Sequence, residues 1–218
     1  MKRATLTISS RNYSSWSLRG WLLCRIAGLD FDEILLPADD PDARAELLHL
    51  APSFRVPRLT HGGCTVWSTP AIAEYLNELV PEAGIWPDSP AARAHCRSVS
   101  GEMHSGFANL RAALPMNLKA RNPGFRVWAG AQADIDRVLT IWRECLKAHG
   151  GPFLFGARPT AADALYAPVA ARFVTYDVTL DGPCAAYRDT IMNWAPMREW
   201  IAGAEAEPAD IDELDVEF

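Results

Sequence analysis

Residues 56–72 read VPRLTHGGCTVWSTPAI and contain three structural elements in close succession. Two short strand-like runs, at 57–60 and 64–67, flank His61-Gly62-Gly63, and glycines at such a position suit the tight turn of a β-hairpin. A helix is expected directly after the second run, because apolar residues recur at helical spacing over 72–79. The stretch therefore predicts strand, turn, strand and helix.

The residues before this stretch also alternate between strand and helix patterns. Apolar residues alternate over 4–8, and helical spacing follows over 18–26 until Gly28 ends it. A second apolar run at 31–36 and a short helical pattern at 41–50 come next. The order βαβ followed by αββα predicts a mixed sheet with helices packed on its faces, which is the thioredoxin-like order.

The amino-acid composition of the chain changes after the helix that is expected to end at Leu79. Residues 81–90 contain three prolines together with Gly84 and Trp86, and this composition predicts an interdomain linker. The rest is expected to be helical, with one helix over 93–113, another over 131–149, and a third starting at a Thr160-Ala161-Ala162-Asp163 capping box. We expect an α/β domain over 1–80, a linker over 81–92 and an all-α domain over 93–218.

Composition excludes several classes of protein. Half of the 218 residues are apolar (49%), which allows a sizeable core, while the net charge of -6 without a basic stripe argues against nucleic acid as a partner. No apolar run approaches the roughly 18 residues that a membrane span requires. The five cysteines are scattered without a Cys-x-x-Cys pair, as in cytoplasmic proteins that keep their thiols reduced.

A hydroxyl-rich segment, Asn12-Tyr13-Ser14-Ser15-Trp16-Ser17-Leu18-Arg19, connects the first expected strand to the first expected helix. A serine at a helix start is most often an N-cap. The chemistry that suits Ser14 is thiol activation, because no Gly-x-Ser-x-Gly elbow surrounds it and no histidine is spaced as its base. A hydroxyl that donates to a bound thiolate, assisted by the helix dipole, would favour the ionised sulfur.

The residues of the opening stretch have their own binding potential. A cis proline at Val56-Pro57 would present the backbone N–H and C=O of Val56 outward, where they can hold a peptide as an added strand. Thr69 is expected at a helix start, where its hydroxyl caps the helix by default or receives a ligand carboxylate.

Together these segments resemble the cytosolic glutathione S-transferase family over nearly the whole chain, and in particular its bacterial, serine-type members. The resemblance is carried by Val56-Pro57, Ala71-Ile72, Trp86-Pro87 and the segment Phe155-Gly156 with Thr160–Asp163. The zeta-class motif Ser-Ser-Cys-x-x-Arg can be laid on Ser14–Arg19 without a gap, with Trp16 in place of the cysteine. The resemblance implies a thioredoxin-like N-terminal domain, an all-helical C-terminal domain and a folding role for Asp163.

The resemblance also implies glutathione as co-substrate, no metal, and a set of site residues. The catalytic candidates are Ser14, Tyr13 and Ser15. Glutathione is expected to contact Arg55, Val56, Pro57, Ser68 and Thr69. The electrophile site is expected to include Trp16, Met103, Phe107 and Arg111, although such an apolar helical stripe is more often core. Ser68 stands where the family has an acid, so glutathione is expected to bind weakly unless an acid from the other subunit of a homodimer replaces it.

The leading hypothesis is a cytoplasmic glutathione transferase, acting in detoxification, that conjugates the thiol to a small hydrophobic electrophile. One alternative is a glutathione-dependent isomerase or dehalogenase on the same fold, although Trp16 in the place of cysteine weighs against zeta-type isomerisation. A further alternative is a weakly active dimeric binding or interaction module. The replacement at Ser68 favours the binding module, and the intact Ser14 motif opposes it.

Overall fold

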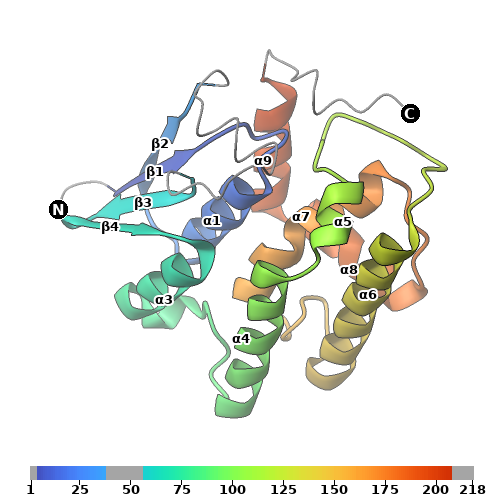
Figure 1. Ribbon diagram of the computed structural model, residues 1–218. Helices are drawn as coiled ribbons and strands as arrows, with labels where there is room; N and C mark the ends of the chain where they lie inside the picture. The colour runs from blue at the N-terminus through green and yellow to red at the C-terminus, as the bar shows by residue number, and fades with distance from the viewer. Residues whose placement is uncertain (1–3, 38–55, 208–218) are drawn as a thin grey trace.

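The computed structural model describes residues 4–37 and 56–207. Its N-terminal part is a four-stranded sheet in the order β2-β1-β3-β4, with β1 parallel to β2 and antiparallel to β3. Helices α1 and α3 lie between this sheet and the remaining helices (Figure 1). The elements are β1 (Ala4–Ile8), α1 (Ser15–Ile26), β2 (Phe31–Leu35), β3 (Arg58–His61), β4 (Cys64–Trp67) and α3 (Thr69–Leu79).

The pattern of residues 56–72 predicts this part of the fold well. The hairpin, its two strands and the following helix are all present, and the turn has Gly62 and Gly63 at φ of 59° and 87°. Only glycine adopts such angles at no steric cost. The short helix expected over 41–50 lies outside the described residues.

The second half is helical, as expected. It contains a 3-10 turn η1 (Pro81–Ala83) and helices α4 (Pro90–Ser105), α5 (Ala108–Ala113), α6 (Ala129–His149), α7 (Ala161–Thr175), α8 (Gly182–Asn193) and α9 (Ala195–Glu205). Helix α4 begins at Pro90, so the last residues of the expected linker form its first turn.

The expectation of one helix over 93–113 is wrong. The chain forms α4 and α5 with a break at Gly106 and Phe107, where Phe107 has a φ of 59° that no α-helix accommodates. Apolar residues keep their helical spacing across the break, because Met103, Phe107 and Leu110 are all buried in one core. The spacing of apolar residues indicates which residues are buried, and it does not indicate whether the backbone continues as a helix. The pattern therefore did not predict the break at Gly106 and Phe107.

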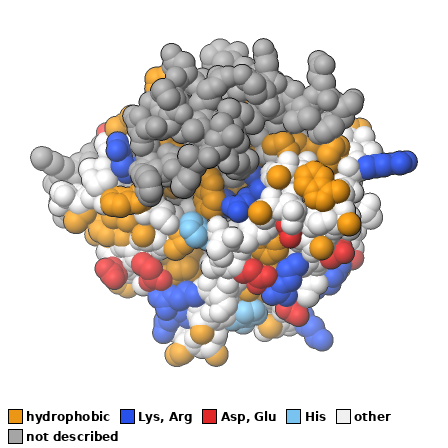
Figure 2. Space-filling model, in the orientation of Figure 1, with side chains coloured by type: hydrophobic (Ala, Val, Ile, Leu, Met, Phe, Trp, Pro, Cys, Tyr) orange, Lys and Arg blue, Asp and Glu red, His pale blue; other side chains and the backbone are white. Residues whose placement is uncertain are grey.

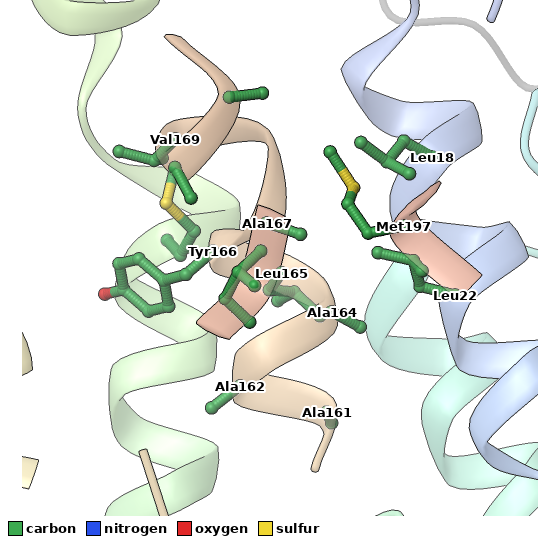
Figure 3. Packing of buried hydrophobic residues seen from close by; sticks show 14 of the residues in the cluster. Leu18, Leu22, Ala161, Ala162, Ala164, Leu165, Tyr166, Ala167, Val169 and Met197 are labelled. Carbon is green, nitrogen blue, oxygen red and sulfur yellow. The ribbon is translucent and has the colours of Figure 1, made fainter. Parts of the chain in front are cut away.

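Helix α7 is the centre of the hydrophobic core, since nearly every residue in it is buried. Figure 3 shows Tyr166 and Val169 pointing toward α4, with Leu18 and Leu22 of α1 on the opposite side of α7. The Tyr166 hydroxyl donates to the carbonyl of Val99 in α4 at 3.1 Å. The two halves of the chain are thus joined through one shared helix.

The start of α7 is held by the fully buried carboxylate of Asp163. It accepts hydrogen bonds from the backbone N–H groups of Leu154 (3.0 Å) and Thr160 (2.8 Å), and from the hydroxyls of Thr160 (3.0 Å) and Tyr187 (3.1 Å). This arrangement matches the capping box expected at Thr160–Asp163.

The five cysteines form no disulfide with one another, and four of them are buried. Burial raises the pKa of Cys24, Cys96, Cys145 and Cys184 to about 12, so these thiols stay protonated and unreactive at neutral pH. None of the described helices is both long and apolar enough to cross a membrane.

Candidate active site at the sheet edge and domain interface

The strand register brings the candidate segments to one edge of the sheet. Thr7 near the end of β1 pairs with Arg58 at the start of β3, and Arg58 pairs with Trp67 at the end of β4. The loop after β1, the Val56-Pro57 dipeptide and the Ser68-Thr69 dipeptide therefore lie next to one another. Segments that are about forty residues apart in sequence form one surface.

The first of these segments ends in Ser14, the N-cap of α1. Its Oγ accepts the backbone N–H of Ser17 at 3.2 Å and donates to the Ser17 hydroxyl at 2.9 Å. Ser17 Oγ also accepts the backbone N–H of Ser9 at 3.0 Å. The Ser14 hydroxyl therefore lies at the positive end of α1, inside a network of serine hydroxyls.

The other two catalytic candidates flank Ser14. Tyr13 is buried, with 6% of its surface exposed. Ser15 is the first residue of α1, and within the described chain its hydroxyl has no hydrogen-bond partner. All three hydroxyl-bearing residues thus stand at the start of one helix.

The Val56–Pro57 peptide bond is cis, as expected. Gly20 of α1 packs so closely against Pro57 that a Cβ at residue 20 would lie 2.4 Å from the Cβ of Pro57 and 3.9 Å from Ile72 in α3. The close contact ties α1, the proline and α3 together. Arg55, the remaining glutathione candidate on this segment, is outside the described residues.

The third segment contains Ser68 and Thr69. Ser68 is the N-cap residue of α3, with a φ of 71°, and its side chain makes no capping hydrogen bond. Thr69 is 1% exposed, and its Oγ1 finds no hydrogen-bond partner in residues 4–37 and 56–207. The expected capping role of Thr69 is therefore wrong. A buried hydroxyl without a partner is costly, and such an atom needs an explanation.

The loop before Ser14 is fastened to the helical half by Glu207, which sequence reasoning missed. The carboxylate of Glu207 accepts the backbone N–H of Arg11 at 2.6 Å and of Asn12 at 3.2 Å, and also the hydroxyl of Ser10 at 2.8 Å. This contact joins residues that are far apart in sequence, because the fold places the end of α9 beside the loop. No local sequence pattern predicts it.

A second group of side chains surrounds Trp16, where α1 meets the helical half. The guanidinium of Arg19 lies 4.4 Å from the Trp16 ring centroid and that of Arg111 lies 5.6 Å from it. The His104 ring meets Trp16 edge-on at 5.1 Å. Arg19 also donates from Nε to the carbonyl of Leu165 in α7 at 2.8 Å. We call Trp16, Arg19, His104 and Arg111 the Trp16 cluster.

The four residues predicted for the electrophile site thus divide into two pairs. Trp16 and Arg111 come together and are half-buried. Met103 is fully buried in the hydrophobic core, and Phe107 is 7% exposed. His104 is a further member of the cluster. In Figure 2, Lys or Arg atoms and a histidine lie beside hydrophobic side chains near the middle of the face.

The electrostatics of the Trp16 cluster are dominated by cations. Burial, and then the charges of Arg19 and Arg111, lower the pKa of His104. Burial lowers the pKa of Arg111, against the opposing effect of Asp134. Arg172 in α7 is fully buried, and this burial together with the charge of Arg111 lowers its pKa to about 10. Sequence reasoning did not predict a role for Arg172. An arginine in the otherwise apolar segment 164–173 was the feature that could have indicated it.

Within the described residues, no group of three or more His, Cys, Asp and Glu side chains is arranged to hold a metal ion.

Models of the glutathione S-transferase N-terminal domain and C-terminal domain match residues 13–79 and 126–203 of this chain. A probable maleylacetoacetate isomerase from Caenorhabditis elegans is 27% identical over 162 residues, which are 73% of each chain. The maleylacetoacetate isomerase of Rattus norvegicus is 27% identical over 176 residues, or 78% of each chain.

Solved structures of this fold are also similar. A glutathione transferase homologue from Burkholderia, with bound glutathione, superposes with a TM-score of 0.70 at 20% identity, covering 94% of this chain and 100% of its own. A maleylacetoacetate isomerase from Anaeromyxobacter dehalogenans, with bound dicarboxyethyl glutathione and citrate, gives 0.67 at 23% identity and covers 98% of both. The matched domains, the mixed sheet and the helical second half together show that this chain belongs to the glutathione S-transferase family.

Proposed function

We propose that this protein is a glutathione-dependent enzyme that binds the tripeptide along the sheet edge and activates its thiol at the start of α1. The observation that carries the proposal is the Thr69 Oγ1 atom, which is buried without a partner in the described structure. It stands at the N-terminus of α3, where backbone N–H groups and the helix dipole favour an anion. The carboxylate of the γ-glutamyl group has the required chemistry.

The rest of the tripeptide would follow the same edge. The backbone N–H and C=O of Val56, ahead of the cis proline, are suited to hold the cysteinyl part as a short added strand. Ser68 has no charge with which to bind the glutamyl ammonium group. Because a charge-assisted hydrogen bond contributes about 1.5 to 3 kcal/mol, we expect weaker glutathione binding than in a protein with an acid at this position.

The catalytic step follows from the position of the hydroxyls. A hydroxyl of Ser14 or Ser15, with Tyr13 as a further candidate, donates a hydrogen bond to the thiolate, and the α1 dipole adds to its stabilisation. The sulfur then forms a C–S bond to the electrophile. In a substitution the leaving group departs with its electron pair, and in an addition to a double bond the neighbouring carbon takes up a proton.

A second candidate is a glutathione-dependent isomerase, favoured by the curated relatives named maleylacetoacetate isomerase. In that reaction the thiolate adds to a conjugated double bond, the resulting single bond rotates, and elimination returns free glutathione. The two candidates differ in a simple measurement: conjugation consumes glutathione in proportion to product, and isomerisation consumes none.

The resemblance further implies a cytoplasmic homodimer, and light scattering during size exclusion tests the oligomeric state. Glutathione binding is tested by retention on immobilised glutathione and by thermal shift with millimolar ligand. We expect Thr69→Val to weaken both responses. Thr65→Val is the matched control, because the Thr65 hydroxyl is on an exposed part of β4. Failure of the wild type in both assays would overturn the proposal.

The catalytic hydroxyl is identified by a short series of variants. Ser14→Ala removes both the hydroxyl and the N-cap, whereas Ser14→Gly removes the hydroxyl and costs only a few tenths of a kcal/mol as a cap. If Ser14 activates the thiol, both variants lose turnover, and the pKa in the pH profile of kcat/KM rises. If Ser15→Ala has this effect instead, Ser14 is a cap and Ser15 is the activating residue.

A further inference from the structure

One face of α9 and of the residues that follow it holds the loop before Ser14. Helix α9 packs against α1 (Figure 1), and Trp200, Gly203 and Glu207 have the spacing of a single helix face. The Trp200 Nε1–H donates to the carbonyl of Arg11 at 2.9 Å, and a Cβ at Gly203 would overlap with the Arg11 side chain. Glu207 adds three hydrogen bonds from its carboxylate to the same loop.

Glu207 is in an unfavourable place with respect to its own helix. A carboxylate beside the C-terminus of a helix meets the negative end of the helix dipole, and α9 has no basic residue in its last turn. Within the described chain, the partners of this carboxylate are the N–H groups of Arg11 and Asn12 and the hydroxyl of Ser10. Lys119 donates from Nζ to the backbone carbonyl of Glu207 at 2.8 Å. The charge is therefore stabilised by the loop and not by the helix.

The Ser10 side chain carries the effect of Glu207 toward the start of α1. Its Oγ donates to Glu207 at 2.8 Å and accepts the N–H groups of Asn12 at 3.1 Å and Tyr13 at 3.3 Å. A hydroxyl has a single proton, so an acceptor at Glu207 leaves the oxygen free to accept both N–H groups. The Ser10 carbonyl in turn accepts the N–H of Ser14 at 2.9 Å. A continuous series of hydrogen bonds thus connects Glu207 to Ser14.

We propose that Glu207 is a positioning residue, which through Ser10 holds the Ser14 hydroxyl in the orientation that stabilises the glutathione thiolate. The inference rests on the proposed glutathione-dependent function and deepens it, because it assigns control of the sulfur to a residue of the helical half. In the described part of the chain, Val56 and Thr69 are not among the partners of Glu207. Glu207 should therefore affect the ionisation of the bound thiol and leave the binding of the peptide part unchanged.

The test replaces Glu207 with glutamine in the full-length protein. Glutamine has nearly the same shape, but it has one acceptor oxygen and would turn an NH2 group toward the donors of the loop. The ultraviolet absorbance of the thiolate measures the pKa of bound glutathione as pH is varied. In Glu207→Gln this pKa should rise by about 1, and kcat/KM below it should fall about tenfold. Glu205→Gln is the matched control, because Glu205 is an exposed acid of α9, and it should leave the thiol pKa unchanged.

A second probe separates positioning from general damage to the site. S-methylglutathione keeps the peptide groups of glutathione and has no ionisable thiol, so a positioning role at the sulfur predicts equal affinities for the wild type and Glu207→Gln. Titration calorimetry measures these affinities, and thermal unfolding measures stability. If Glu207→Gln lost stability and affinity for S-methylglutathione but kept the thiol pKa of the wild type, Glu207 would only support the fold and the inference would be wrong.

Ser10→Ala tests the same series of hydrogen bonds from its other end. It should also raise the thiol pKa, and the double variant with Glu207→Gln should show no more than the larger single effect, because residues that act through one network are not additive. Additive effects on the thiol pKa would contradict a shared network. If Glu207→Gln does not fold, Ser10→Ala decides alone, and a wild-type thiol pKa in that variant would refute the inference.

The same samples separate this inference from the proposed function. A wild type that binds glutathione and has the same thiol pKa as every variant would leave the proposed function standing and remove the role of Glu207. A wild type that binds neither glutathione nor S-methylglutathione would overturn the glutathione-dependent function itself.

Discussion

The side chain of Asn12 joins the loop before Ser14 to Leu118 in the helical half of the chain. Its Oδ1 accepts the backbone N–H of Leu118 at 2.7 Å and that of Lys119 at 3.1 Å, and its Nδ2 donates to Asn117 Oδ1 at 3.0 Å. Asn12 is fully buried. One short amide side chain therefore satisfies two backbone donors and holds the start of the hydroxyl-rich loop against the other half.

Asn12→Ala is expected to reduce both stability and turnover. The change removes the acceptor of the Leu118 N–H and one of the two acceptors of the Lys119 N–H, which also donates to Asn117 Oδ1 at 3.1 Å. This loss should lower the free energy of unfolding by about 1 to 3 kcal/mol. It also releases the loop that positions Ser14, so kcat should fall even where the protein is fully folded. Urea unfolding and steady-state kinetics measure the two effects. The control is Asn193→Ala, because Asn193 is exposed and its replacement should change neither the free energy of unfolding nor kcat. Equal effects of Asn12→Ala and Asn193→Ala would refute the role of Asn12.

Gly20 and Gly101 provide a matched pair of helical glycines. A Cβ at residue 20 would lie 2.4 Å from Pro57, so Gly20→Ala should separate α1 from the Val56-Pro57 segment and weaken glutathione binding. At Gly101 in α4 a Cβ meets nothing within 4 Å. Gly101→Ala should therefore raise the free energy of unfolding by about 0.5 to 1 kcal/mol, because alanine is the better helix former. Thermal unfolding with and without glutathione distinguishes Gly20→Ala from Gly101→Ala. If Gly20→Ala kept the stability and the glutathione binding of the wild type, this result would contradict the packing argument.

Ser68 offers a gain of function. If the missing acid limits affinity, Ser68→Glu should tighten glutathione binding by about tenfold through a charge-assisted hydrogen bond to the glutamyl ammonium group. The φ of 71° at residue 68 strains any residue other than glycine, so Ser68→Ala serves as a control with the same backbone cost. Calorimetry gives the two affinities. If Ser68→Glu binds no more tightly than Ser68→Ala, a different group already holds the ammonium end.

Much of the sheet-edge site followed from local sequence. Ser14 at a helix start, the proline after Val56 and the threonine after Ser68 each have a recognisable position relative to a strand or helix. The chain order βαβ then αββα fixes where those positions meet, because strand register brings the ends of β1 and β4 to the start of β3. Sequence was therefore sufficient for the two-part fold and for the positions of these segments, while their roles in binding and catalysis stay predictions.

The Trp16 cluster and the Asn12 contacts were not predictable in the same way. The charge of Arg111 in α5 lowers the pKa of Arg172 in α7, and Asn12 is hydrogen-bonded to Leu118 across 106 positions of the chain. Such contacts depend on how helices cross, which apolar spacing does not encode. The break at Phe107 was missed for a related reason, since a buried residue keeps the helical pattern whether or not the backbone continues as a helix.

His104 should make stability depend on pH in a predictable direction. Its pKa in the folded protein lies below the value of about 6.5 expected in the unfolded chain, because of burial and the charges of Arg19 and Arg111. Between these two values the unfolded state binds more protons, so the free energy of unfolding falls as pH is lowered from 7 through about 6. The fall ends once the folded protein also takes up the proton. Urea unfolding at several pH values should show a smaller decrease for His104→Gln than for the wild type, and parallel curves would refute the assignment. The difference between the two curves is the quantity that isolates His104.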